Sequence, residues 1–182
     1  MDHEMRQALI DQYCEGPGVV TAALAGATDE ELDARPAPNE WSAREVVHHL
    51  ADSEATSYIR IRRLLAEDNP VIYGYDEAEF ARRLHYDRPI AASLAVLKSV
   101  RASTTELLRS LDDDDWARSG THTESGPYSV QTWLAIYAAH AHDHAGQISR
   151  ARSAATPSSP TVSSTTASSG GGSRVLRRMR LA

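Results

Sequence analysis

Two histidines, His140 and His144, are four residues apart in a segment rich in alanine and aromatic residues. Residues three or four apart lie on one face of an α-helix. At about 100° per residue, both imidazoles share a stripe with Trp133 and Tyr137 and should point into the core, whereas His142 should be solvated. Two inward imidazoles one turn apart can bind one metal ion, because imidazole is a preferred ligand of zinc and similar ions.

A third ligand must come from elsewhere, and the best candidates are the adjacent residues His48 and His49. They lie in a predicted helix that starts at Ser42, an N-cap residue followed by Glu45 in the capping-box position. On a helical wheel with Leu50 at 0°, the centre of the apolar face lies near +20°. His49 lies roughly 120° from this centre and His48 roughly 140° from it. Periodicity therefore does not decide which of the two reaches the core.

Glu54 lies near +40° on the same helical wheel, so its side chain should also face inward. One interpretation is that Glu54 orients a metal ligand or a bound water molecule by a hydrogen bond. The other is that it is an ordinary buried carboxylate with its own polar partners. The sequence favours neither.

Helical spacing of apolar residues extends over most of the first 150 residues, and no useful length of strand-like alternation occurs. The first helix should be interrupted at Gly16-Pro17-Gly18, where Pro17 should kink or restart it, because proline lacks a backbone N–H and clashes with the preceding turn. The four long helices are predicted over about 4–24, 42–68, 90–111 and 129–150. Shorter helices are expected after Thr28 and over 77–84, and a loop or short irregular hairpin over 121–128.

The segment between the second and third long helices is about 20 residues long. Antiparallel neighbours in a bundle are usually joined by about 2–8 residues. A longer link allows the two helices to run parallel through a crossover connection. We therefore predict an all-α four-helix bundle with up-down-down-up order, with an up-down bundle carrying an inserted lid as the alternative.

Composition limits the remaining possibilities. The chain has 182 residues, 41% of them hydrophobic, which is enough for one domain with a core. The net charge of −6 argues against a nucleic-acid-binding domain. The apolar stretches are too short for a membrane span, and the first residues do not resemble a signal peptide. Cys14 is the single cysteine, expected to be a small buried apolar residue, and its isolation fits a reducing cytoplasm.

The composition changes at Ser153, after which serine, threonine, proline and glycine dominate. Such a segment cannot bury enough apolar surface to offset the entropy lost on ordering. We therefore predict a bundle domain over 1–152 and a disordered low-complexity tail over 153–182.

The motif Trp-Ser-x-Arg-Glu-Val-Val-His-His-Leu-Ala-Asp-Ser-Glu at 41–54 resembles the DinB superfamily, and is most similar to its YfiT-like branch, which includes bacillithiol S-transferases. The resemblance covers about 7–150. It implies a four-helix bundle with a divalent metal on three histidines, one before Leu-Ala-Asp-Ser and two in His-x-x-x-His. In this sequence they are His49, His140 and His144. YfiT-like proteins usually have further histidines where this chain has Asp143 and Gly146-Gln147, so substrate identity does not carry over.

Three protein ligands leave one coordination position open. There a metal can generate a thiolate or a hydroxide at neutral pH. The favoured hypothesis is a low-molecular-weight-thiol S-transferase that uses zinc, with a small-molecule thiol and an electrophile as partners. Nickel, iron and manganese are alternative metals.

The runner-up function is a metal-dependent hydrolase of an amide or ester, and the second alternative is a non-enzymatic, stress-related metal-binding bundle. The resemblance also directs attention to the linker 73–75 as a wall of the site. We expect no nucleic acid and no membrane as partner, and we retain a homodimer as one assembly to be tested.

Overall fold

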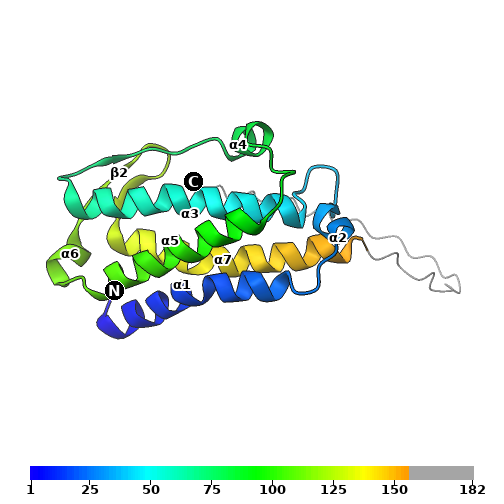
Figure 1. Cartoon of the computed structure of the whole chain (residues 1–182). Coiled ribbons are helices and arrows are strands. Elements are labelled where there is room, and N and C mark those ends of the chain that lie inside the picture. The colour runs from blue at the N-terminus through cyan, green and yellow to red at the C-terminus, as the bar shows by residue number, and fades with distance from the viewer. Residues whose placement is uncertain (156–182) are drawn as a thin grey trace, which may run out of the picture.

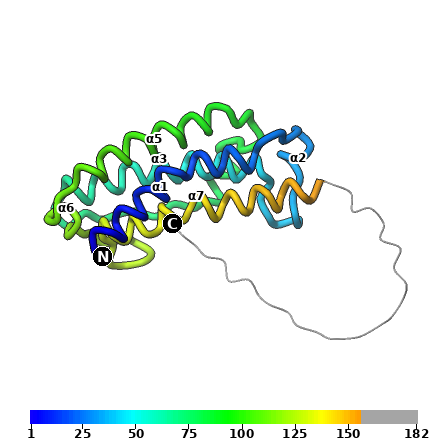
Figure 2. Tube along the Cα trace, turned by 90° about the horizontal axis from the view of Figure 1, so that it is seen from below, coloured from blue at the N-terminus to red at the C-terminus, as the bar shows by residue number. Residues whose placement is uncertain are grey.

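Four long helices form the protein in the computed structural model, which describes residues 1–155 (Figure 1). α1 and α7 run in one direction and α3 and α5 in the other, so the expected up-down-down-up four-helix bundle is confirmed (Figures 1 and 2). α1 packs against α5 and α7, and α3 packs against the same two helices. Their bounds are α1 (His3–Ala23), α3 (Ala43–Ala66), α5 (Ala91–Arg109) and α7 (Val130–Ser153).

The two helices that carry the candidate histidines begin at capped residues. Ser42 accepts a hydrogen bond from the backbone N–H of Glu45, and the Glu45 carboxylate accepts one from the backbone N–H of Ser42. At the start of α7, the Ser129 hydroxyl accepts from the backbone N–H of Thr132. A cap of this kind contributes about 1 kcal/mol and fixes where the helix begins. The caps therefore help to set the positions of His49 and His140 along the bundle.

The remaining elements are short. The link from α3 to α5 contains β1 (Val71–Ile72) and α4 (Glu77–Arg83), and the link from α5 to α7 contains a hairpin. β1 pairs in parallel with β2, and β2 pairs antiparallel with β3, giving the order β1-β2-β3. The hairpin matches the second of the two alternatives, a loop or a short irregular hairpin, expected over 121–128, whereas β1 was not predicted, because two residues are too few to show alternation. The other elements are α2 (Asp29–Asp33), α6 (Asp113–Ala117), β2 (Ser119–His122) and β3 (Gly126–Ser129).

The core has two hydrophobic clusters, one toward each end of the bundle. Trp133 and Tyr137 of α7 belong to the first, and Ala141 and Ile148 of the same helix belong to the second. His140 therefore lies where the two apolar clusters meet. No helix within residues 1–155 is both long and apolar enough to cross a membrane.

A buried arginine joins all four long helices. Arg101 of α5 forms an ion pair with Glu54 of α3, with Nε 2.8 Å from Oε1. Its Nη1 donates to the backbone oxygen of Tyr13 in α1 at 2.7 Å, and its Nη2 donates to that of Tyr137 in α7 at 2.9 Å. Because a buried guanidinium is stable only when its donors are paired, these contacts fix the relative positions of the helices.

α1 is continuous through Pro17, so the prediction that the helix stops and restarts at Gly16-Pro17-Gly18 was wrong. Pro17 has no N–H for the carbonyl of Tyr13, four residues earlier, and that oxygen accepts from Arg101 instead. Gly16 leaves the space, since a Cβ there would lie 2.0 Å from Arg101 Nη1. The arginine thus satisfies the carbonyl that proline leaves without its helical partner.

Cys14 is exposed, contrary to the expectation that it is buried. It follows buried Tyr13 on α1 and is turned away from the core by the helical rotation of about 100° per residue. At the other end of the chain, α7 ends at Ser153. The predicted low-complexity tail, apart from its first three residues, lies outside the described residues.

Replacing Gly16 with alanine should lower the free energy of unfolding by about 3 kcal/mol or more, because the new Cβ displaces the Arg101 guanidinium from its buried partners. Chemical denaturation of both proteins would measure the difference. Gly18→Ala is the matched control: no atom lies within 4 Å of its Cβ position, so it should raise stability by up to about 1 kcal/mol. Equal effects of the two substitutions would contradict this role of Gly16.

Candidate metal centre

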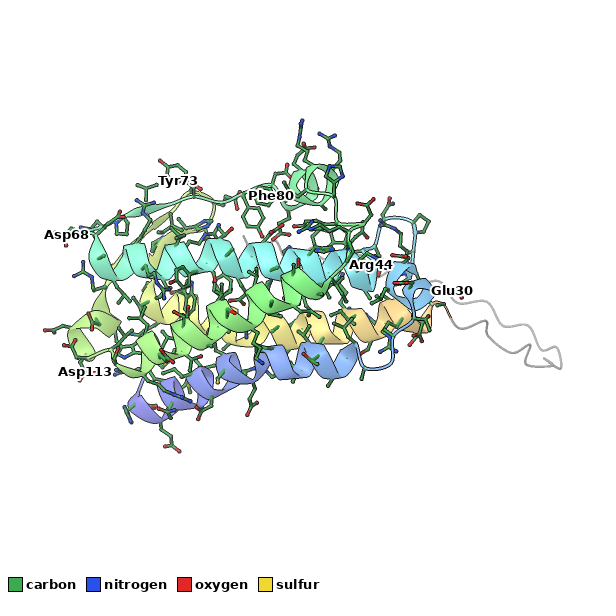
Figure 3. The ribbon with its side chains drawn as sticks, in the orientation of Figure 1. Glu30, Arg44, Asp68, Tyr73, Phe80 and Asp113 are labelled. Carbon is green, nitrogen blue, oxygen red and sulfur yellow. The ribbon has the colours of Figure 1, made fainter. Side chains whose placement is uncertain are left out.

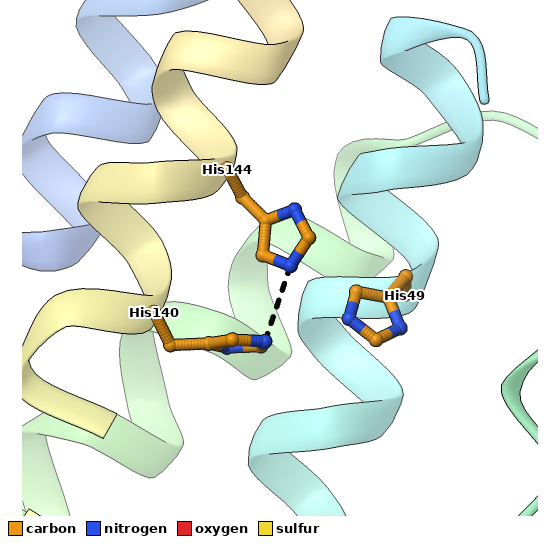
Figure 4. Close-up of side chains that lie close together, drawn as sticks. All are labelled: His49, His140 and His144. Carbon is orange, nitrogen blue, oxygen red and sulfur yellow. Dashed lines mark hydrogen bonds between the residues drawn. The ribbon is translucent and has the colours of Figure 1, made fainter. Parts of the chain in front are cut away.

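Three histidines from two helices meet inside the bundle (Figure 4). His49 comes from α3, and His140 and His144 come from successive turns of α7. One ring nitrogen of each lies within 4.8 Å of the others. His49 is 2% exposed and His140 is 4% exposed, while His144 is partly buried. The structure therefore brings together the three histidines that the family resemblance implied.

His48, the neighbour that periodicity could not separate from His49, faces a different part of the protein. Its Nδ1 lies 2.8 Å from the Ser93 hydroxyl, and its Nε2 lies 2.9 Å from the backbone oxygen of Arg88. A carbonyl oxygen only accepts, so Nε2 carries the hydrogen and Nδ1 accepts from Ser93. Both nitrogens are thus used to attach the start of α5 to α3.

The orientation of His144 is set by Gln147, one turn later on α7. His144 Nδ1 lies 2.8 Å from Gln147 Oε1, an atom that only accepts, so Nδ1 carries the hydrogen. The lone pair of His144 is then on Nε2, which lies 3.1 Å from Nε2 of His140. Two nitrogens bound to one tetrahedral zinc at about 2.0–2.1 Å would be about 3.3 Å apart, so this pair has a suitable spacing.

Gln147 appeared in the sequence as a departure from the family pattern. Its role as a hydrogen-bond partner was not predicted, although its spacing of three residues from His144 on one helix was a usable signal. Such partners fix the tautomer and ring orientation of a metal-binding histidine.

All three imidazoles are electrically neutral in this setting. Burial, with a contribution from nearby His144, lowers the pKa of His49 to about 3. Burial also lowers the pKa of His140 well below its usual range, and that of His144 to a smaller extent. Within the described part of the chain, Nδ1 of His49 and Nδ1 of His140 are buried without a hydrogen-bond partner. Neutral imidazoles with free nitrogens are the form that binds metal, so the residues fit a divalent ion.

Glu54 is paired away from this centre. One of its oxygens accepts from Arg101, and the other accepts from the Tyr13 hydroxyl at 3.0 Å. Among the described residues it forms no hydrogen bond with His49, His140 or His144, so the structure matches the interpretation of a paired buried carboxylate.

The other histidines are apart from the cluster. His142 was expected to be solvated, but it is partly buried, with Nε2 3.1 Å from the backbone oxygen of Gln12, because α1 packs over that side of α7. His122 is buried in the hairpin, and His3 and His85 are exposed.

Aromatic rings surround the three histidines. The Trp41 ring centroid lies 4.9 Å from that of His49, and the Tyr137 ring centroid lies 5.7 Å from that of His140. The Tyr137 hydroxyl accepts a hydrogen bond from Arg60 Nη1 at 3.2 Å. Arg60 Nη2 in turn donates to the backbone oxygen of Tyr73, so the polar surroundings continue from the histidines to the linker.

Comparison with known proteins identifies relatives of the whole bundle. The family model of the DinB superfamily matches residues 12–148. A protein of Oceanobacillus iheyensis is 34% identical over 81% of this chain and 88% of its own length, and one of Halalkalibacterium halodurans is 34% identical over 71% and 76%. The names of both describe them as candidate metal-dependent hydrolases.

A solved structure is also similar. YfiT from Bacillus subtilis superimposes with a TM-score of 0.77 at 32% identity, covering 81% of this chain and 86% of YfiT. That protein is described as a candidate metal-dependent hydrolase with an unusual four-helix bundle topology. The similarity thus extends from sequence to the arrangement of the helices.

The metal-free protein should lose stability in mild acid. A histidine with a lowered folded-state pKa binds fewer protons folded than unfolded, so stability falls as the pH drops below the unfolded value of about 6.5. His49 is such a residue, with its pKa lowered to about 3. We expect chelator-treated protein to lose up to about 1.4 kcal/mol per pH unit for this histidine between pH 6 and 4.

Denaturation at several pH values would measure this dependence. His49→Gln should show a shallower slope than the wild type, and His85→Gln, at an exposed position, should retain the wild-type slope. An unchanged slope in His49→Gln would show that this residue does not resist protonation.

Proposed function

This chain belongs to the DinB superfamily, and we propose that it is a metal-dependent enzyme whose divalent ion is held by His49, His140 and His144. The observation that carries the proposal is the convergence of three imidazoles, two buried and one partly buried, each with a lowered pKa. The metal-dependent activity in the names of the relatives supports it. Zinc fits the nitrogen donors best, with nickel, iron and manganese as alternatives.

An enzymatic role is favoured over a structural one by the number of ligands. Within residues 1–155, three side chains are placed to bind the same metal ion. The sequence beyond residue 155 contains no histidine, cysteine, aspartate or glutamate that could serve as a fourth ligand. Structural zinc sites almost always have four protein ligands, whereas catalytic sites keep one position for water or substrate. A bound divalent ion would lower the pKa of a thiol or water molecule at that position.

We propose transfer of a low-molecular-weight thiol to an electrophilic small molecule. Glu54, the buried carboxylate of α3, is held by Arg101 and Tyr13, so it is not free to accept a proton from water. A thiol needs less help, because its pKa of about 8.5 is already close to neutral. In the reaction the thiol releases its proton to solvent. Its sulfur forms a bond to the electrophilic carbon, and the leaving group departs with the bonding electrons.

The protein's own residues would position the reactants. Gln147 holds His144 in one tautomer, and the rings of Trp41 and Tyr137 border His49 and His140. These aromatic rings exclude water from two sides of the imidazoles. Holding thiol and electrophile together in this setting would supply the proximity on which the rate depends.

Hydrolysis of an amide or ester is the second candidate, and two observations favour it. The relatives are named as metal-dependent hydrolases, without a substrate, and the link between α3 and α5 carries Glu77, whose pKa is raised to about 7 by burial and by the neighbouring Glu124 charge. A carboxylate with a pKa near neutral is suited to act as a general base toward water.

The metal assignment has a direct test. The purified protein should contain about one divalent ion per chain, and the triple variant His49→Ala, His140→Ala, His144→Ala should lose it, because all three nitrogen donors are removed. Elemental analysis by mass spectrometry measures the stoichiometry. His48→Ala should keep the metal, since both nitrogens of His48 bond elsewhere. Full metal occupancy in the triple variant would refute the assignment.

The reaction should be visible with monochlorobimane as the electrophile. Metal-loaded protein is incubated with bacillithiol, mycothiol, glutathione, cysteine or coenzyme A, and the fluorescent conjugate is followed. We expect metal-dependent conjugation with one of these thiols, and loss of at least about 100-fold in rate in His49→Ala, a typical effect of removing a group that activates a nucleophile.

A different result would favour hydrolysis over thiol transfer: no conjugation with any of the thiols, together with His49-dependent cleavage of amide or ester substrates. If Glu77 is the base, the rate of that cleavage should rise with pH through about 7, and this rise should be absent in Glu77→Gln.

A further inference from the structure

A group of buried polar atoms without partners surrounds Arg60, on the side of the bundle covered by the linker and the hairpin. Arg60 is 3% exposed, and His122 and Tyr128 of the hairpin are 1% and 2% exposed. Within residues 1–155, Nε of Arg60, Nε2 of His122 and the Tyr128 hydroxyl have no hydrogen-bond partner, and the Tyr75 hydroxyl has none within hydrogen-bonding distance, although Ser53 is near enough to lower its pKa. Buried polar groups are nearly always paired, so these four atoms leave hydrogen-bonding capacity that a bound group can satisfy.

Three separate parts of the chain contribute these atoms. Arg60 belongs to α3, Tyr75 to the linker, and the other two residues to β2 and β3. The Arg60 guanidinium carbon lies 5.8 Å from the Tyr75 ring centroid, and the ring centroids of His122 and Tyr128 are 5.4 Å apart. Arg60 Nη2 donates to the backbone oxygen of Tyr73, and the preceding residue, Ile72, pairs with His122 in the sheet, so the hairpin lies beside the segment that Arg60 contacts.

All four atoms can donate a hydrogen bond. The backbone N–H of Glu124 donates to Nδ1 of His122, so the hydrogen of this neutral imidazole is on Nε2. Arg60 Nε is a donor in every state, and a phenol hydroxyl donates when an acceptor is present. The cluster therefore has a surplus of donors, and a ligand that satisfies it must supply acceptor oxygens.

The charges also favour an anion over a cation. Arg60 uses Nη1 and Nη2 for Tyr137 and the Tyr73 carbonyl, and it takes part in none of the ion pairs in the described part of the chain. The carboxylates of this region include Glu77 and the exposed residues Asp76 and Glu124. Burial and Glu124 raise the pKa of Glu77 to about 7, so it carries only part of a negative charge at neutral pH.

The cluster is connected to the three histidines by Tyr137. This residue contacts His140 with its ring and accepts from Arg60 with its hydroxyl. One molecule can therefore place its reacting group at the histidines and another polar group beside Arg60. Tyr73 lies on the exposed side of the linker: it is 66% exposed and points away from α3 (Figure 3). The Phe80 ring instead packs against Tyr75, with ring centroids 4.5 Å apart and ring planes inclined by 45°.

We propose that Arg60, Tyr75, His122 and Tyr128 bind a carboxylate group of the substrate whose reacting group is held at the three-histidine centre. This inference rests on the proposed function for the identity of the reacting group, but not for the binding of the carboxylate. One carboxylate oxygen accepts from Arg60 Nε, and the remaining acceptor capacity is used by His122 and the two phenols. The substrate is thus an acidic small molecule, in which a carboxylate is separated from the thiol by several bonds.

The test compares thiols that differ only at the far end of the molecule. 6-Mercaptohexanoate, 6-mercapto-1-hexanol and 6-amino-1-hexanethiol are titrated into the metal-loaded full-length protein by calorimetry, with 3-mercaptopropionate and 11-mercaptoundecanoate to vary the span. We expect one of the carboxylates to bind about tenfold more tightly than the alcohol, the gain typical of a hydrogen bond to a charged group. Sulfur binding is followed separately by the visible spectrum of cobalt-substituted protein.

Tyr128→Phe is the decisive variant, because it removes a hydroxyl that has no partner within the protein. It should keep the metal content and the melting temperature of the wild type, and it should reduce the preference for the carboxylate to about threefold or less. Tyr73→Phe, which removes an exposed hydroxyl of the linker, is the matched control and should keep the full preference. Arg60→Gln should abolish the preference, with circular dichroism to check that this variant is folded.

The outcomes separate this proposal from the proposed function. If all thiols change the cobalt spectrum but bind equally well, or if the amine binds most tightly, the carboxylate site is refuted and the thiol-binding centre stands. If no thiol changes the spectrum, thiol transfer is refuted, and titration with sodium hexanoate alone decides the subsite. Hexanoate binding that is weakened by Tyr128→Phe supports it, and the absence of binding overturns it.

Discussion

The structure depends on one buried cation, the guanidinium of Arg101. Removing such a group from water costs several kcal/mol unless its donors are paired, and here its partners come from the other three long helices. Glu54 is five residues after His49 on α3, and the Tyr137 carbonyl is three residues before His140 on α7. The contacts that satisfy Arg101 therefore also hold the two histidine-bearing helices at the relative height that brings His49 to His140 and His144.

The histidines lie between two apolar clusters. This position keeps the imidazoles neutral, but it also destabilises the fold, because it leaves polar atoms buried without partners. Burial keeps the imidazoles neutral, as metal binding requires, but it leaves Nδ1 of His49 and of His140 without partners in the described part of the protein. Unpaired buried polar atoms destabilise a fold. The Nε2 atoms of His140 and His144 have a spacing suited to one metal ion, and only the folded protein holds them together with His49, so metal binding should stabilise the fold.

Local signals in the sequence were sufficient for most of the architecture. The caps at Ser42 and Ser129, the helical periodicity and the long link predicted the helices and their order, because each depends on neighbouring residues or on chain length. Which of His48 and His49 joins the cluster could not be predicted from the helical wheel, where the two lie roughly 140° and 120° from the apolar centre. It depends on the contacts of His48 with Ser93 and Arg88, which are 40 residues or more away in sequence.

The errors have the same origin. Gly16-Pro17-Gly18 has the composition of a helix break, and it fails to break α1 because Arg101, distant in sequence, supplies the hydrogen bond that Pro17 cannot donate. The unpaired donors near Arg60 come from three separated segments, so no local pattern predicts them.

The topology of the bundle brings these three segments together. Because α3 and α5 are parallel, the chain must return along the bundle between them, and this obligatory crossover carries Tyr75 and Glu77 past α3. β1 then pairs with β2, which places the hairpin residues His122 and Tyr128 beside the same linker. The connection that the helix order requires is therefore also the segment that completes the polar surroundings of the histidine centre.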